Sequence, residues 1–232
     1  MATVKDPTVR PGAVQAFVAG NYYDYFSLLG MHVHPNGGQV VRAFLPWASS
    51  VAVLERESGA EVTQLRKIDE AGFFSGEMNG RRDRFAYRLR VSGPDWSTEI
   101  DDPYRFGLLI QPMDIHLLCE GTHLEAYKAM GAHCRTIEGV SGVVFTVWAP
   151  NARRVSVVGA FNRWDGRVHG MRLRRECGIW EIFIPGIGPG MLYKYEIIGA
   201  DGNLLPLKAD HYAFQSEHAQ DAASIVTDPT AV

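Results

Sequence analysis

An internal repeat is the feature that most constrains the fold of this 232-residue chain. Three motifs occur twice, in the same order. Pro46 aligns with Pro150, an offset of 150 − 46 = 104, and Tyr104 aligns with Tyr212, an offset of 212 − 104 = 108. The matching segments are 40–53 with 144–157, 85–89 with 193–197, and 102–106 with 210–214. This near-constant spacing indicates two homologous domains of about 100 residues each, a common domain size.

Both copies alternate apolar and polar residues over short runs, as at Val51 and Val53 in the first copy and Val143, Phe145 and Val147 in the second. A period of two in runs rich in Val, Ile, Tyr and Phe is typical of half-buried strands. Turn-forming Gly, Asn and Asp residues separate the runs. We therefore predict an all-β chain of two tandem immunoglobulin-like β-sandwich modules joined by a short, partly helical linker. Helices are predicted only over 13–19 and 124–130.

The repeat also predicts where the modules begin and end. We expect an N-terminal extension with a short helix, a first sandwich module, a linker segment, a second sandwich module and a short tail. Their predicted ranges are 1–22, 23–107, 108–135, 136–228 and 229–232.

Composition excludes several classes of function. The net charge is −3, whereas a dedicated nucleic-acid binder needs a basic surface to meet phosphates, and a peripheral membrane anchor needs a basic cluster. No apolar run approaches the roughly 20 residues that cross a bilayer, and the N-terminus has no secretory signal. Three widely spaced cysteines do not suggest a disulfide framework or a zinc site. We expect a cytoplasmic protein whose cysteines act as small hydrophobic residues.

The motifs of the second copy carry a family resemblance. They are Trp148-Ala149-Pro150, Phe161-Asn162-Arg163-Trp164 and Tyr193-Lys194-Tyr195. Together they resemble the family 48 carbohydrate-binding module of glycogen branching enzymes. In the first copy, segments 28–32 and 102–106 are similar to the first module of the bacterial enzymes. The resemblance covers 23–227; it departs from the family at 23–26 and at His211, where the family often has other residues.

The resemblance implies the non-catalytic N-terminal portion of a bacterial 1,4-α-glucan (glycogen) branching enzyme, a glycosyltransferase of glycogen biosynthesis. In that family a (β/α)₈ barrel carries the catalytic Asp and Glu, and this sequence ends shortly after 223–226, where the barrel would be joined. We therefore expect no catalytic residue and no activity in this chain alone. The carboxylates at Asp69, Glu70, Asp101, Asp102 and Asp165 are expected to be solvated or to cap turns. No cofactor or metal site is expected; the implied partners are α-1,4-glucan or glycogen, bound weakly, and the catalytic barrel.

The resemblance also implies a glucan-binding site at Trp164, Lys194 and Asn162. Flat aromatic rings stack on the apolar faces of sugars, so an exposed Trp on a loop suits this task. A second Trp that strong binders carry near 204–205 is missing, and Ala223-Ser224 replaces an Asn pair. Trp47, Trp148 and Trp180 lie in strand-like sequence and are predicted to be core residues. The alternative hypothesis is a structural or protein-interaction sandwich pair without sugar affinity. Glucan binding at this site requires Trp164 to be exposed with Lys194 nearby, and it fails there if both are buried.

Overall fold

The structure is a computed structural model that describes residues 8–122, 125–217 and 222–228. The chain divides into two compact units, Met1–Arg105 and Phe106–Val232. Both units are built from antiparallel strands packed in layers, which confirms the predicted all-β fold. None of the helices in the described part of the chain is long and apolar enough to cross a membrane.

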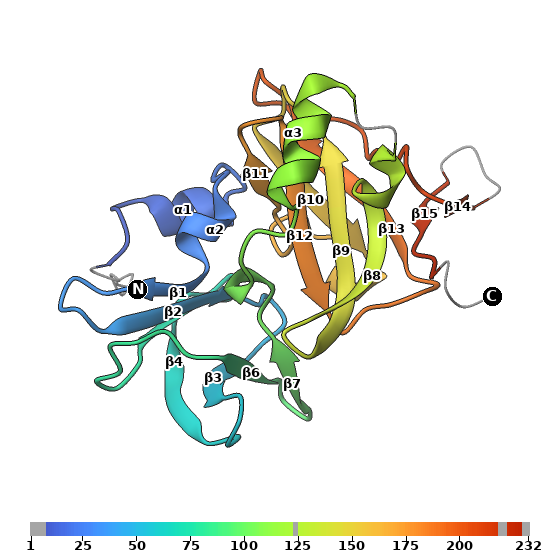
Figure 1. Ribbon diagram of the computed structural model, residues 1–232. Coiled ribbons are helices and arrows are strands. Elements are labelled where there is room, and N and C mark those ends of the chain that lie inside the picture. Colours follow the sequence, from blue (N-terminus) through green and yellow to red (C-terminus); the bar gives the residue numbers. More distant parts are fainter. Residues whose placement is uncertain (1–7, 123–124, 218–221, 229–232) are drawn as a thin grey trace. The chain divides into compact units, whose positions relative to one another are not determined.

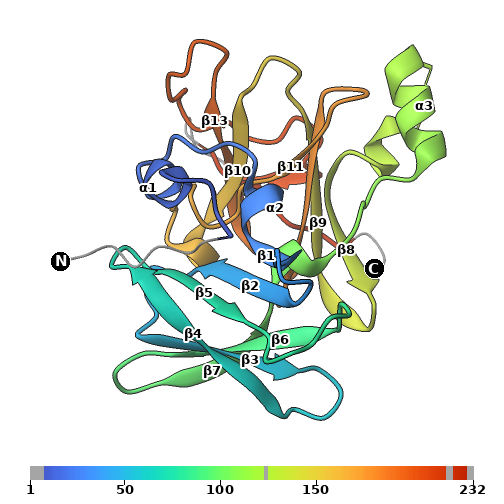
Figure 2. The ribbon, with the colours of Figure 1, turned by 90° about the vertical axis from the view of Figure 1, so that its left-hand side faces the viewer.

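The first unit is a sheet of seven strands in the order β1-β2-β5-β4-β3-β6-β7. The long strand β4 joins its two layers: its first half pairs with β3, its last residues pair with β5, and the register shifts between Lys67 and Asp69. Such a bulge bends a strand, so one sheet can fold over itself (Figure 2). The strands are β1 (Gly30–Val33), β2 (Gln39–Phe44), β3 (Ser50–Glu55), β4 (Glu61–Asp69), β5 (Phe73–Glu77), β6 (Tyr87–Ser92) and β7 (Ser97–Asp101).

Residues from both layers of the first unit form one apolar core. Val41 and Phe74 contribute from the β1-β2-β5 layer, and Val53 and Leu89 from the β3-β6-β7 layer. Buried and half-buried residues alternate along β6, as the period of two predicts. Each fully buried side chain of this size stabilises the fold by about 1.5–3 kcal/mol.

The second unit is a sandwich of two four-stranded sheets, β11-β12-β9-β8 and β10-β13-β15-β14 (Figure 1). Phe145 on β9 and Tyr193 on β13 meet edge-to-face between the sheets, with ring centroids 4.9 Å apart. The strands are β8 (Gly131–Ile137), β9 (Val140–Trp148), β10 (Arg154–Gly159), β11 (Arg172–Arg174), β12 (Ile179–Pro185), β13 (Leu192–Ile198), β14 (Gln215–Ser216) and β15 (Ser224–Ile225).

Strand pairing confirms the internal repeat. The order β1-β2-β5-β4 in the first unit corresponds to β8-β9-β12-β11 in the second, and the pair β3-β6 corresponds to β10-β13. Each copy also contains a glycine of positive φ packed directly on the proline of the aligned motif. A Cβ at Gly72 would lie 2.5 Å from the Pro46 Cα, and one at Gly178 would lie 2.7 Å from the Pro150 Cβ. Only glycine fits such a close approach.

The helices agree with the sequence in part. The helix predicted over 13–19 is present as α1 (Ala13–Val18), whose Phe17 packs on Phe44 and Phe73, and α2 (Tyr25–Leu28) follows it. The described part of 124–130 contains only a single 3₁₀ turn, Ala126–Lys128. The helix in that region is instead α3 (Pro112–Glu120). Its sequence signals are Pro112 in its first turn and Gly121 in the left-handed conformation at its end.

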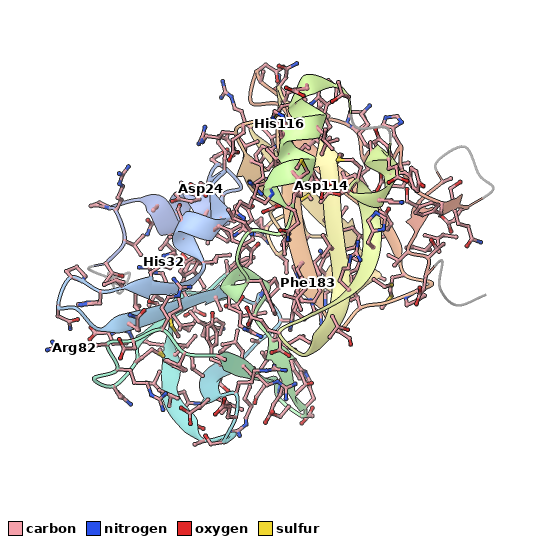
Figure 3. The ribbon with its side chains drawn as sticks, in the orientation of Figure 1. Asp24, His32, Arg82, Asp114, His116 and Phe183 are labelled. Atoms are coloured by element: carbon pink, nitrogen blue, oxygen red, sulfur yellow. The ribbon has the colours of Figure 1, made fainter. Side chains whose placement is uncertain are left out.

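Helix α3 covers the outer face of the β11-β12-β9-β8 sheet (Figure 1). Ile115 of α3 packs with Ile179 of β12 and with Met130. Further along β12, Phe183, labelled in Figure 3, packs edge-to-face on Phe106 at 4.7 Å. A fully buried carboxylate at Glu181 accepts hydrogen bonds from the backbone N–H groups of Leu109 and Ile110 and pairs with Arg172 and Arg174. Both apolar and polar contacts therefore hold the segment 106–110 against the sheet.

Two of the three tryptophans predicted as core residues contact a core. Trp180 is buried, and Trp47 packs on the core of the first unit. The prediction for Trp148 was wrong, because this side chain is 64% exposed. Phe145 points into the sandwich, so alternation along β9 places Trp148 on the outer face, and α3 covers only part of that face.

Candidate functional site

The loop that carries Trp164 has an unusual backbone. It leaves β10 through a 3₁₀ turn, Ala160–Asn162, and then passes through two consecutive left-handed residues, Arg163 (φ 56°) and Trp164 (φ 59°). Residues other than glycine rarely adopt this conformation, and each one costs about 1–3 kcal/mol. The Trp164 N–H donates a 2.9 Å hydrogen bond to the Gly159 carbonyl, and the side chain is 41% exposed. The loop thus holds a large aromatic side chain at the surface in one strained geometry.

Asn162 lies beneath this loop and has no exposed surface. Its Oδ1 accepts the Gly159 N–H (3.0 Å), and its Nδ2 donates to the Val157 carbonyl (2.8 Å) and to Nδ1 of His169 (2.9 Å). These bonds occupy both ends of the amide. A direct contact between Asn162 and a sugar, as the resemblance implies, would require the side chain to break them. In this structure Asn162 fixes the loop that presents Trp164.

The partner of Asn162 is an uncharged histidine. Because Nδ1 of His169 accepts the amide hydrogen, the remaining ring proton belongs on Nε2. Burial holds the pKa of His169 well below its ordinary value of 6.5, so the ring stays neutral near pH 7. The hydrogen bond to Asn162 depends on this neutral form.

Lys194 lies on β13 and points away from the core. Its neighbours Tyr193 and Tyr195 are fully buried, so strand alternation directs Lys194 to the outer face, where it is half-buried. Lys194 stands opposite Val158 of β10, one residue before the Gly159 carbonyl that binds the Trp164 N–H. The register therefore brings Trp164 and Lys194 to the same end of the β10-β13 pair, although 30 residues separate them (194 − 164 = 30).

The acids of the loop and the strand below it are paired. Glu196 forms an ion pair with Arg154, and the loop passes so close that a Cβ on Gly166 would collide with the Glu196 carboxylate. Burial raises the pKa of Asp165, but the guanidinium and backbone N–H of Arg167 outweigh it, so the net shift is downward. Asp165 therefore caps a turn, as expected from the sequence.

Two more of the candidate acids, and two histidines that are close in the sequence, also serve the fold. Asp101 pairs with Arg56, and Asp69 caps its turn by accepting the Ala71 N–H (2.8 Å). Of the two histidines in His32-x-His34, His32 donates to the Leu29 carbonyl (2.8 Å) and His34 contacts Glu77 (3.3 Å). Within residues 8–122, 125–217 and 222–228, no three His, Cys, Asp or Glu side chains group in a way that could hold a metal ion.

Two sequence families match the chain, one over each unit. Residues 10–104 match the N-terminal domain of alpha-1,4-glucan branching enzyme GlgB. Residues 129–231 match carbohydrate-binding module 48, also described as the isoamylase N-terminal domain. Each match covers most of one unit and less than half of the chain. In the unit that matches module 48, the Trp164 loop and Lys194 lie on the β10-β13 pair, and the other unit has Ala86 at the position aligned with Lys194.

Solved structures of larger enzymes are also similar to the chain. Pullulanase from Anoxybacillus sp. LM18-11, complexed with maltotetraose, is 14% identical with a TM-score of 0.35; the match covers 82% of this chain and 25% of that one. Apo pullulanase from Klebsiella pneumoniae is 17% identical with a TM-score of 0.34; the match covers 81% of this chain and 23% of that one. The chain thus spans about a quarter of the length of these relatives.

Proposed function

We propose that the family 48 module binds α-1,4-glucan at Trp164 and Lys194, and that within a glycogen branching enzyme it positions glucan chains for a catalytic barrel. The observation that carries the proposal is the exposed Trp164 side chain on a strained loop. An aromatic face offers a stacking surface for a sugar ring, and the Lys194 ammonium offers hydrogen-bond donors to hydroxyl groups.

Preorganisation supports this site. The strained backbone at Arg163 and Trp164 persists because Asn162 holds the turn from below. A site whose side chains are already ordered loses less entropy when the ligand binds. Strain of this kind is common where a protein presents a functional side chain.

The first unit is not proposed to bind glucan. Ala86 stands where the second unit has Lys194, and β3 runs through a short turn directly into β4, so there is no counterpart of the Trp164 loop. The two copies share a scaffold, but only one carries both elements of the site. We assign the first unit a structural role beside the module.

The chemistry of chain transfer is proposed to belong to the barrel. Retaining glycosyl transfer uses two carboxyl groups about 5–5.5 Å apart on either side of the scissile bond. The buried carboxylates Asp102, Asp210 and Glu181 are all engaged in hydrogen bonds within the core, so they are poor candidates. No residue of this chain is therefore assigned a catalytic role.

A second candidate function, protein docking without sugar affinity, is favoured by a different observation. Trp148 is more exposed than Trp164 and lies on the opposite sheet of the same unit. An exposed Trp on a sheet face is typical of an interface. The two functions use different tryptophans, so one set of variants separates them.

The test is co-sedimentation of the purified chain with glycogen, comparing Trp164→Ala, Lys194→Ala and Trp148→Ala. We expect Trp164→Ala to weaken retention about tenfold, the magnitude of a lost stacking contact, while Trp148→Ala leaves it unchanged. Trp148→Ala is the matched control because it removes an exposed tryptophan from the same unit. Absence of retention by the folded wild-type chain would overturn the proposal, and loss in Trp148→Ala alone would move the site to the other sheet.

A further inference from the structure

Two of the three cysteines, which the sequence separates by 177 − 119 = 58 positions, lie together in the fold. Cys119 is in the last turn of α3, and Cys177 is in the turn between β11 and β12. The Cys119 thiol donates to the carbonyl of Glu176 at 3.2 Å, one residue before Cys177. Cys177 follows Glu176 directly, so this contact places the Cys119 thiol against the backbone next to Cys177.

The elements that carry both thiols are held in place. On the helix side, Ile115 and Leu118 of α3 pack in one apolar cluster with Ile179 and Cys177 itself. On the turn side, the indole N–H of Trp148 donates to the Cys177 carbonyl at 3.1 Å, and Gly178 packs against Pro150. The proximity of the thiols thus follows from the packing of a helix on a sheet.

We propose that Cys119 and Cys177 form a redox-reactive pair that closes an intramolecular disulfide when the protein meets a peroxide. The two thiols differ in accessibility as such a reaction requires, because Cys119 is exposed and Cys177 is half-buried. The exposed thiol meets the oxidant first, and the enclosed thiol resolves the product. Burial raises the pKa of the Cys177 thiol, which agrees with Cys177 reacting after Cys119.

The reaction balances with hydrogen peroxide as the oxidant. The Cys119 thiolate attacks one peroxide oxygen, the O–O bond breaks, and a sulfenic acid and hydroxide form. The Cys177 sulfur then attacks the sulfenic sulfur, the S–O bond breaks, and water leaves with the Cys177 proton. In total, two thiols are oxidised to one disulfide, and one peroxide is reduced to two waters.

The third cysteine is an internal control. Cys134 lies on β8, faces the carbonyl of Thr227 at 3.9 Å, and is half-buried. Burial raises the pKa of its thiol as well, and no cysteine lies beside it in the described part of the chain. We therefore expect Cys134 to remain reduced while the pair reacts.

The disulfide would fasten the C-terminal end of α3 to the sheet. Closing a loop of this length restricts the unfolded chain, so the oxidised protein should unfold at a temperature several degrees higher. The same link would fix one wall of a pocket of about 370 Å³, which is lined by Leu118, Met130, Trp148, Cys177 and Tyr212 among others.

The experiment treats the reduced full chain with equimolar hydrogen peroxide and counts free thiols. We expect the count to fall from three to one, a mass loss of about 2 Da, a crosslinked peptide containing Cys119 and Cys177, and reversal by dithiothreitol. Cys177→Ser should stop at a sulfenic acid on Cys119, Cys119→Ser should keep both of its thiols, and Cys134→Ser should form the disulfide as the wild type does. A crosslink through Cys134, a disulfide-linked dimer, or oxygen addition without a crosslink would overturn the proposal.

Discussion

The hydroxyl of Tyr87 donates a 2.5 Å hydrogen bond to Oδ2 of the buried Asp102, and the second unit repeats this contact between Tyr195 and Asp210 at 3.1 Å. In both units the other oxygen of the aspartate accepts a backbone N–H two residues later, at 2.9 Å. Each aspartate therefore ties a central strand to the turn that follows. The repeat visible in the sequence is thus a repeat of one buried polar contact as well as of strands.

The buried Asp102 should make stability depend on pH. Burial raises its pKa to about 6, whereas the unfolded chain releases the same proton near 3.8. The folded state therefore binds more protons between these values, and the free energy of unfolding should fall by about 2 kcal/mol as pH rises from 4 to 6. The asparagine in Asp102→Asn does not titrate, so the free energy of unfolding of this variant should fall by that much less between pH 4 and pH 6. Urea unfolding of both proteins at pH 4, 5, 6 and 7 measures the difference; parallel curves would contradict it.

Asn162 should control glucan binding without touching the glucan. Asn162→Ala leaves the Gly159 N–H, the Val157 carbonyl and His169 Nδ1 without their partner, which should destabilise the second unit by about 1–3 kcal/mol. The strained loop then loses its support, and glycogen retention should fall about threefold to tenfold. Co-sedimentation and thermal unfolding measure both effects.

The matched control for this variant is Asn203→Ala, which removes an exposed asparagine bonded to Asp201 in another turn. It should retain wild-type binding. Equal binding by Asn162→Ala and wild type would show that the loop keeps its conformation without the buried amide.

The second unit should lose stability in mild acid through His169. Its pKa is lowered by burial, so the unfolded chain binds a proton below about pH 6.5 that the folded unit excludes. The free energy that the neutral ring contributes to folding is fully present above about pH 6.5, and it decreases as the pH falls below this value. The free energy of unfolding should therefore be about 2 kcal/mol lower at pH 5 than at pH 7.5 through this group. His169→Gln cannot titrate, and its difference in unfolding free energy between these two pH values, measured by urea unfolding, should be smaller by that amount; an equal difference in both proteins would exclude His169 as the cause.

The carboxylate of Glu181 should be essential to the second unit. Glu181→Gln removes the charge that balances Arg172 and Arg174 in a buried position, so the unit should lose about 3–5 kcal/mol. Glu176→Gln is the control, because Glu176 also lies near Arg174 but is exposed, and such pairs contribute at most about 1 kcal/mol. Denaturant unfolding measures how much unfolding free energy each of the two variants loses. Similar midpoints would mean that solvent reaches the Glu181 network.

The sequence by itself determined the architecture. Alternation of apolar and polar residues and the doubled motifs are local patterns, and they specify which residues pair and face inward, because side chains on a strand have a period of two. The Trp-Ala-Pro and Phe-Asn-x-Trp motifs of the second copy, and segments 28–32 and 102–106 of the first, indicated the two families whose models match these units. Helix α3 was not predicted from the sequence, although Pro112 and Gly121 stand at its ends, because the segment between them lacks a strong apolar stripe.

The tertiary structure decided which outward-facing residues meet solvent and which distant side chains meet each other. Asn162 is buried because the loop folds over it, and Trp148 is exposed because α3 covers only part of its sheet. The pairing of Cys119 with Cys177 depends on how that helix packs against a turn 58 residues away. Local patterns do not encode these contacts, because they arise only when separate elements share one packed core.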